Sequence, residues 1–139
     1  MRYDDVQSHL AAAGGSMDKA AVPLGMYLAW CVNVGLTGAE LDESAQTAVL
    51  RVRYREITGA ELLISACAGA LDARWFNEQG RDFCERYYAS FLDDFRAVFG
   101  DDIYEVRDDW DHYDQLAPLL TERLYGKPRR SKPWWKLWR

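Results

Sequence analysis

Carboxylates crowd one stretch of the sequence and are its most obvious chemical groups. Within 22 residues there are nine of them: Asp93, Asp94, Asp101, Asp102, Glu105, Asp108, Asp109, Asp111 and Asp114. Such a cluster can hold a hard cation, supply paired acid and base groups, or attract a basic protein. No interval in it supplies the glycine and distal glutamate of a calcium loop. A solvated surface with helix caps is the simplest interpretation, and a docking surface for a basic partner is the functional one.

One histidine lies inside this acidic stretch. His112 follows Asp111 and is close in sequence to Asp109, so the three side chains suggest a small metal-dependent hydrolase as one hypothesis. Elsewhere the chain has no Gly-x-Ser-x-Gly elbow and no glycine-rich phosphate loop. We rank the hydrolase last of three hypotheses and predict no catalytic residue, no metal and no cofactor.

Two aromatic residues, Trp110 and Tyr113, are interleaved with the acids. Large aromatic side chains commonly anchor protein interfaces, where their burial supplies much of the binding energy. The predicted partner-binding surface therefore consists of the nine carboxylates together with Trp110 and Tyr113. A homodimer formed through aromatic surface is a further option that the sequence leaves open.

The last thirteen residues have the opposite charge. Residues 127–139 hold six Lys or Arg side chains, three tryptophans and no acid, so the net charge of −5 divides into −11 before Lys127 and +6 from there on. Amphipathic rings beside cations are typical of a weak contact with anionic membranes. This pattern favours a peripheral membrane adaptor as the second hypothesis, or else a tail folded back onto the acidic body. The candidate contact residues are Trp134, Trp135, Lys136 and Trp138.

Composition predicts a folded, acidic, cytoplasmic protein that does not bind nucleic acid. With 139 residues and 49% hydrophobic residues, the chain has enough apolar side chains for one core. Its three cysteines are widely spaced in apolar segments, match no zinc spacing with either histidine, and are interpreted as reduced core thiols. The apolar part of the uncharged segment 20–39, from Leu24 to Leu36, is about 20 Å long as a helix, too short for a membrane span.

Hydrophobic periodicity predicts an all-α fold, a compact single-domain bundle of about five to six helices over residues 1–126, followed by the basic tail 127–139. A short extended segment is expected near 101–106. Residues 49–56 fit both a helix and a half-buried strand, and helix is preferred, with Ala48, Leu50 and Tyr54 facing inward. The expected helices are 3–13, 23–34, a segment from 42 or 44 to 54, 58–68, 76–99 and 109–124.

Several local signals refine these helices. Thr58 and Glu61 form a capping box. Gly80 interrupts the apolar face of 76–99 and indicates close approach of another element, and a kink is expected near Ser90. Pro118 should bend or restart the last helix, because proline removes a backbone donor and clashes with the preceding turn.

Six segments resemble a family of small, uncharacterised bacterial proteins. They are Tyr3 to Val6 (YDDV), Gly25 to Asn33 (GMYLAWCVN), Thr58 to Leu63 (TGAELL), Phe76 to Phe83 (FNEQGRDF), Tyr87 with Tyr88 (YY) and Asp109 to Asp114 (DWDHYD). The resemblance implies one compact domain and carries no activity, and the tail lies outside it.

Size, acidity and the missing catalytic signature together favour a non-catalytic interaction protein. The first hypothesis is a bacterial immunity protein, which neutralises a toxin by binding its basic domain and occluding its active site. This is an analogy to a functional class.

Overall fold

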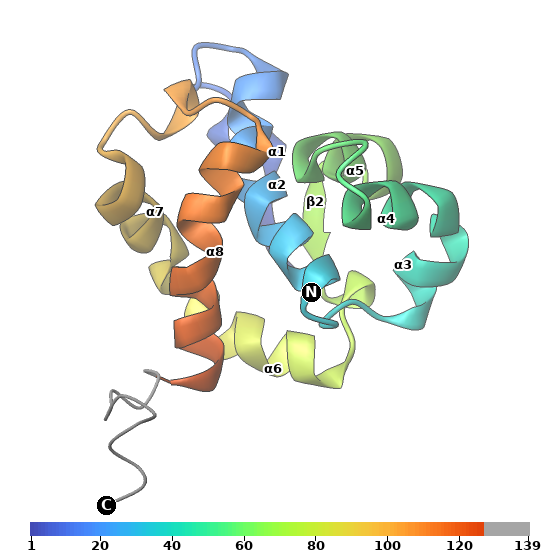
Figure 1. Cartoon of the computed structure of the whole chain (residues 1–139). Coiled ribbons are helices and arrows are strands. Elements are labelled where there is room, and N and C mark those ends of the chain that lie inside the picture. The colour runs from blue at the N-terminus through green and yellow to red at the C-terminus, as the bar shows by residue number, and fades with distance from the viewer. Residues whose placement is uncertain (127–139) are drawn as a thin grey trace, which may run out of the picture.

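In the computed structural model, which describes residues 1–126, the predicted central helix is α2 (Met17–Asn33) (Figure 1). It begins six residues before the predicted start at Pro23, because the Ser16 side chain caps it by accepting the backbone N–H of Lys19 at 3.2 Å. Every residue from Ala20 to Val32 is buried. Pro23 thus lies inside the helix, in its buried part. The tail contact residues Trp134, Trp135, Lys136 and Trp138 lie outside the described residues.

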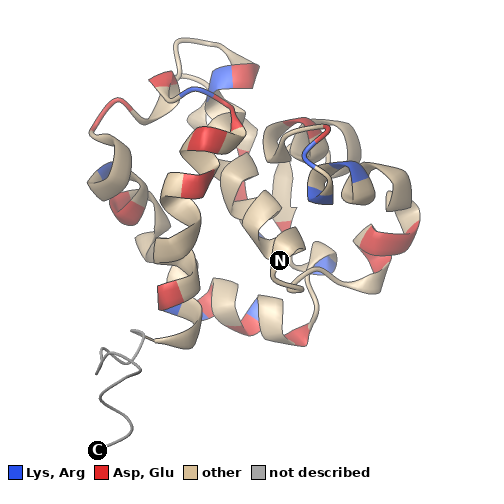
Figure 2. Cartoon of the chain, in the orientation of Figure 1, with Lys and Arg blue, Asp and Glu red and all other residues tan. Residues whose placement is uncertain are grey.

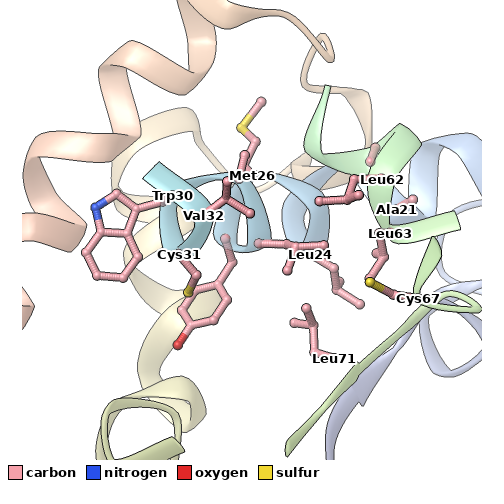
Figure 3. Packing of buried hydrophobic residues seen from close by; sticks show 14 of the residues in the cluster. Ala21, Leu24, Met26, Trp30, Cys31, Val32, Leu62, Leu63, Cys67 and Leu71 are labelled. Carbon is pink, nitrogen blue, oxygen red and sulfur yellow. The ribbon is translucent and has the colours of Figure 1, made fainter. Parts of the chain in front are cut away.

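The helix α5 (Gly59–Ala66) packs directly on α2. The Thr58–Glu61 capping box that starts it is confirmed. Leu62 and Leu63 lie beside Leu24 of α2 in the core (Figure 3). The backbones touch where the two glycines meet, since a Cβ added at Gly25 would lie 2.2 Å from the nitrogen of Ala60 and one at Gly59 would lie 1.8 Å from the Gly25 oxygen.

Residues 39–53 form two short helices, α3 (Ala39–Ser44) and α4 (Gln46–Arg53), so the preference for helix over strand at 49–56 is confirmed. Of the three residues predicted to face inward, Ala48 is partly buried against the core, whereas the prediction was wrong for Leu50 and Tyr54. Val49 and Val52 are buried, three residues apart, whereas Leu50 is 41% and Tyr54 73% exposed. Leu50 and Tyr54 lie four residues apart on the opposite side of the same helix.

The N-terminal prediction of a helix over 3–13 was wrong in its first part. Residues 2–5 form β1 (Arg2–Asp5), which pairs antiparallel with β2 (Ala70–Asp72), and only α1 (Val6–His9) is helical after it. The partner strand is three residues long and lies more than sixty residues away in the chain. A pairing of this kind leaves no periodic signal in the sequence.

The predicted long helix over 76–99 is divided. After the short 3₁₀ turn η1 (Ala73–Trp75) come α6 (Glu78–Tyr87), the 3₁₀ turn η2 (Tyr88–Ser90) and α7 (Phe91–Phe99). The break at η2 confirms the kink expected near Ser90. The close approach predicted at Gly80 is confirmed: the chain just after α2 passes so near that a Cβ at Gly80 would lie 2.2 Å from the Leu36 oxygen.

The connection 101–106 contains a 3₁₀ turn, η3 (Ile103–Glu105), in place of a purely extended segment; Val106 alone is extended at its end. The last helix, α8 (Trp110–Tyr125), continues through Pro118 without the predicted restart. Three residues beyond the proline, the Thr121 hydroxyl accepts a hydrogen bond of 3.1 Å from the Trp30 indole, which ties this part of α8 to α2.

The predicted core thiols are confirmed: Cys31, Cys67 and Cys84 are free and buried. Burial raises the pKa of Cys67 and of Cys84 to about 12, so both stay protonated near neutral pH. Within residues 1–126, no helix combines the length and the apolar character needed to cross a membrane.

Candidate acidic docking surface

Asp94, in the first turn of α7, makes hydrogen bonds that connect α7 to α6 and α8. Its carboxylate accepts hydrogen bonds from the Tyr87 hydroxyl at 2.7 Å and from the Arg123 Nε at 2.9 Å. The Arg123 guanidinium, together with the Tyr87 hydroxyl, holds the pKa of Asp94 below its usual range. The side chain is only 14% exposed, so a partner has little of it to contact.

The Asp94→Asn variant should lose stability and part of its sensitivity to acid. A carboxylate whose pKa is lower in the folded than in the unfolded state stabilises the fold above its unfolded pKa, and this contribution is lost as pH falls through the folded pKa. We expect a loss of about 1–3 kcal/mol at pH 7, from bonds to a charged group. The difference from the parent chain should shrink below about pH 4. Urea unfolding across pH measures both effects, with Asp93→Asn, 84% exposed at the side chain, as the near-neutral control.

Asp114 and Trp110 belong to one cluster around Arg55. The guanidinium binds both oxygens of Asp114, at 2.7 and 2.9 Å, and lies 4.9 Å from the centroid of the Trp110 ring. The neighbouring Tyr113 is only 6% exposed, and its hydroxyl accepts a hydrogen bond of 2.9 Å from the Asn33 amide. Of the two predicted aromatic anchors, Trp110 is half-buried beneath Arg55 and Tyr113 is part of the core.

Asp109 is the N-cap of α8. It accepts the backbone N–H of His112 at 2.8 Å and contacts the Nδ1 of the same residue at 2.7 Å, and these hydrogen bonds lower its pKa. Asp111 is exposed and makes no ion pair within residues 1–126. Across that same part of the chain, no three His, Cys, Asp or Glu side chains gather as a metal site would require. The contacts of Asp109 and His112 are those of a helix cap.

Asp108 lines a groove where α2, α5 and the segment before α8 meet. The groove has a volume of about 420 Å³. Its apolar residues are the aliphatic side chains of Val22, Ala60, Ile64 and Val106, and its rim carries Asp18, Lys19, Glu61 and Asp108. We call this hollow the acid-rimmed groove. Sequence analysis found only Asp108 of these residues, since all the others except Val106 come from α2 and α5, which become its neighbours only in the fold.

The charges of the acid-rimmed groove are unbalanced. Its one cation, Lys19, is paired with Glu105 at 3.0 Å. Within residues 1–126, no cation pairs with Asp18, Glu61 or Asp108. Burial is the main cause that raises the pKa of Asp108, and the charges of Glu61, Asp109 and Asp18 add to it, although the Thr58 hydroxyl donates a hydrogen bond to Asp108 at 2.7 Å. The groove therefore combines apolar surface with negative charge that a cation would relieve.

The other members of the predicted cluster lie at the surface, and Asp101, Asp102 and Glu105 line a second hollow that shares Lys19 with the groove. Asp101 and Asp102 follow α7, Glu105 ends η3, and Asp111 is in the first turn of α8. Figure 2 shows carboxylates over this end of the molecule, from α7 to the start of α8. Among residues 1–126 there is no ion-pair partner for Asp101, Asp102 or Asp111, whereas Asp93 lies 3.5 Å from Arg96. These side chains are available to a partner.

Sequence analysis missed a buried polar network around His9. The Asp4 carboxylate contacts His9 Nε2 at 2.8 Å and accepts a hydrogen bond of 2.6 Å from the Tyr88 hydroxyl, while His9 Nδ1 lies 2.5 Å from the Tyr104 hydroxyl. Burial and the charge of Asp4 raise the pKa of Tyr104, which disfavours its use as a nucleophile. The network links β1 and α1 to η2 and η3. Its directly contacting members are up to 95 residues apart, so no local spacing reveals it.

Removing the His9 ring should destabilise the fold by about 2–4 kcal/mol, because His9→Ala leaves the Tyr104 hydroxyl without its ring partner and leaves the Asp4 carboxylate with the Tyr88 hydroxyl alone. The matched control is His112→Ala, whose ring is 33% exposed and whose loss leaves the Asp109 backbone cap in place. That control should cost about 1 kcal/mol or less. Urea midpoints for the two variants make the comparison, and equal losses would contradict the structural role of the network.

Residues 2–107 match the protein family described as Domain of unknown function (DUF7832). The chain belongs to this family. No curated protein and no solved structure matches the sequence. The DUF7832 match includes all four members of the His9 network and the groove residues up to Val106, and it ends one residue before Asp108. The resemblance to an uncharacterised family is thereby confirmed for most of the chain, while the DWDHYD segment lies beyond the match.

Proposed function

We propose that this protein is a non-catalytic interaction protein whose acid-rimmed groove, with the exposed carboxylates beside it, binds a basic protein. The observation that carries the proposal is the unbalanced groove itself. Asp18, Glu61 and Asp108 surround aliphatic surface without a cation of their own within residues 1–126. Mutual repulsion of this kind is relieved when a Lys or Arg side chain enters, with its aliphatic stem against the apolar floor.

The distribution of charge around the groove supports a macromolecular partner. Asp101, Asp102 and Asp111 are exposed and add negative charge from the end of α7 to the first turn of α8, a stretch in which Arg107 is an exposed cation. A predominantly negative surface steers an oppositely charged protein into place and speeds its association. Three other carboxylates already have partners within the molecule: Asp94 binds Arg123, Asp109 binds His112 and Asp114 binds Arg55. We infer that these three stabilise the fold and do not contact the partner.

The partner we propose is a toxin with a basic domain, and the protein is then an immunity protein. Toxins that act on phosphate-bearing substrates need basic clefts, and an acidic surface that fills such a cleft blocks access to it. This step uses analogy to a functional class. It agrees with the small acidic body and with side chains at the predicted hydrolase site that serve as a helix cap.

Co-expression with the product of the adjacent gene tests the proposal. We expect the chain to rescue cells from the toxicity of that product and to co-purify with it. The Asp18→Lys variant should lose both effects, while Glu85→Lys, an equal change of charge on the exposed side of α6, should keep them. Absence of rescue and of co-purification by the parent chain would remove the proposal.

A further inference from the structure

We infer that the basic C-terminal segment of this chain, residues 127–139, occupies the acid-rimmed groove of the same molecule. The inference uses the groove assigned above to a basic partner, and so it makes the segment an internal competitor of that partner. Its grounds are the chemistry of the groove, the composition of the segment and the length of chain that joins them.

The groove and the segment are complementary in charge and in apolar surface. The segment carries six cationic side chains and three tryptophans without an acid. The groove offers three carboxylates that have no cation within residues 1–126, together with the aliphatic surface of Val22, Ala60, Ile64 and Val106. Asp101 and Asp102 also line a hollow with apolar side chains, but its third acid, Glu105, is paired with Lys19. The groove joins three carboxylates without a cation within residues 1–126 to apolar surface that an indole ring can bury.

The connecting chain is long enough to reach. Asp109 and the sixteen residues of α8 separate Asp108 at the groove from Gly126, and α8 alone is about 24 Å long. Trp134 follows Gly126 by eight residues and Trp138 by twelve, which span up to about 26 and about 40 Å when extended. Trp138, and Trp134 at full extension, therefore come within reach of the groove.

Zero-length cross-linking of the full chain with a carbodiimide tests this docking, because the reagent joins only a lysine and a carboxylate in contact. Three of the four lysines, Lys127, Lys132 and Lys136, lie in the segment. The fourth, Lys19, lies 3.0 Å from Glu105 and is an internal positive control. We expect peptides that join Lys132 or Lys136 to Asp18, Glu61 or Asp108 in a monomeric product, and their loss at high salt.

Two results would overturn the inference. Tail lysines joined only to acids outside the groove, or to none while the Lys19 link forms, exclude docking in the groove. Links found only in a covalent dimer show that the segment enters a second copy. As a functional readout, replacing Trp134 and Trp135 by serine should increase affinity for the basic partner several-fold, since the competitor is weakened.

The two proposals fail separately. If the groove binds only the basic partner, the cross-links between tail lysines and groove acids are absent, while the chain still rescues cells from the product of the adjacent gene. If the groove binds only the C-terminal segment, these cross-links form and rescue is absent. An unchanged partner affinity in the Trp134→Ser, Trp135→Ser variant would contradict the competition between them.

Discussion

Replacing Gly25 with alanine is expected to lower the free energy of unfolding by about 3 kcal/mol or more. In an unobstructed helix the same change stabilises by about 1 kcal/mol, because alanine is the better helix former. Here the new methyl group would lie 2.2 Å from the nitrogen and 2.4 Å from the Cα of Ala60, and both are backbone atoms. A flexible side chain could turn aside, but the first turn of α5 must move as a unit, and the contact between α2 and α5 opens.

Gly35→Ala provides the matched control for this prediction. Gly35 has φ +79°, and a Cβ there would meet nothing within 4 Å, so its replacement costs only backbone strain of about 1–2 kcal/mol. Urea unfolding of both variants gives the comparison. A Gly25→Ala protein as stable as the parent chain, or more stable, would show that the two helices do not approach as closely as described.

Charge changes in the acid-rimmed groove should weaken binding of the basic partner about 100-fold. The variant that decides this combines Asp18→Lys with Asp108→Asn. The first change reverses an exposed charge, and the second keeps an oxygen that can accept the Thr58 hydrogen bond. Removing negative charge slows association, and losing a half-buried ion pair speeds dissociation. Titration calorimetry with the product of the adjacent gene measures the affinity.

The control is a pair with the same total change of charge on α6, Asp82→Asn with Glu85→Lys. Both side chains are exposed and neither lines the groove. This control should weaken binding only slightly, through the loss of long-range attraction. Equal weakening by the two pairs would mean that net charge, and not the groove, determines affinity.

Binding should also weaken as the solution becomes more acidic. The pKa of Asp108 is raised above its ordinary value in the free protein, mainly by burial. A cationic partner stabilises the charged form, so association releases a proton near that pKa, and affinity falls as pH drops through it. In Asp108→Asn this part of the pH dependence should be absent. Calorimetry over a series of pH values measures it, and an unchanged profile in the variant would exclude Asp108 from the contact.

The sequence predicted the fold where structure depends on local signals. Thr58 with Glu61 marked the start of α5, and the apolar character of 24–32 marked the buried helix α2. Where long-range contacts decide, prediction was wrong. The pairing of β1 with β2 joins segments more than sixty residues apart. The start of α2 was missed for a local reason, because the Ser16 cap begins the helix six residues before Pro23.

The nine carboxylates of the candidate site have different structural roles, which the sequence could not indicate. Nine carboxylates close together in sequence become separate in role, because Asp94 and Asp114 meet arginines brought from distant segments. Asp108 instead faces Asp18 and Glu61, which come from α2 and α5. Proximity in sequence located the acidic end of the molecule, and the packing of α2 against α5 determined which acids line the acid-rimmed groove.

The central claim, that the acid-rimmed groove binds a basic protein, is tested most directly by mapping backbone amide chemical shifts of the labelled chain during titration with the product of the adjacent gene. The account predicts that the largest changes fall on Asp18, Val22, Ala60, Glu61, Ile64, Val106 and Asp108. Changes confined to α3, α4 or α6, or no change at saturating partner, would contradict it.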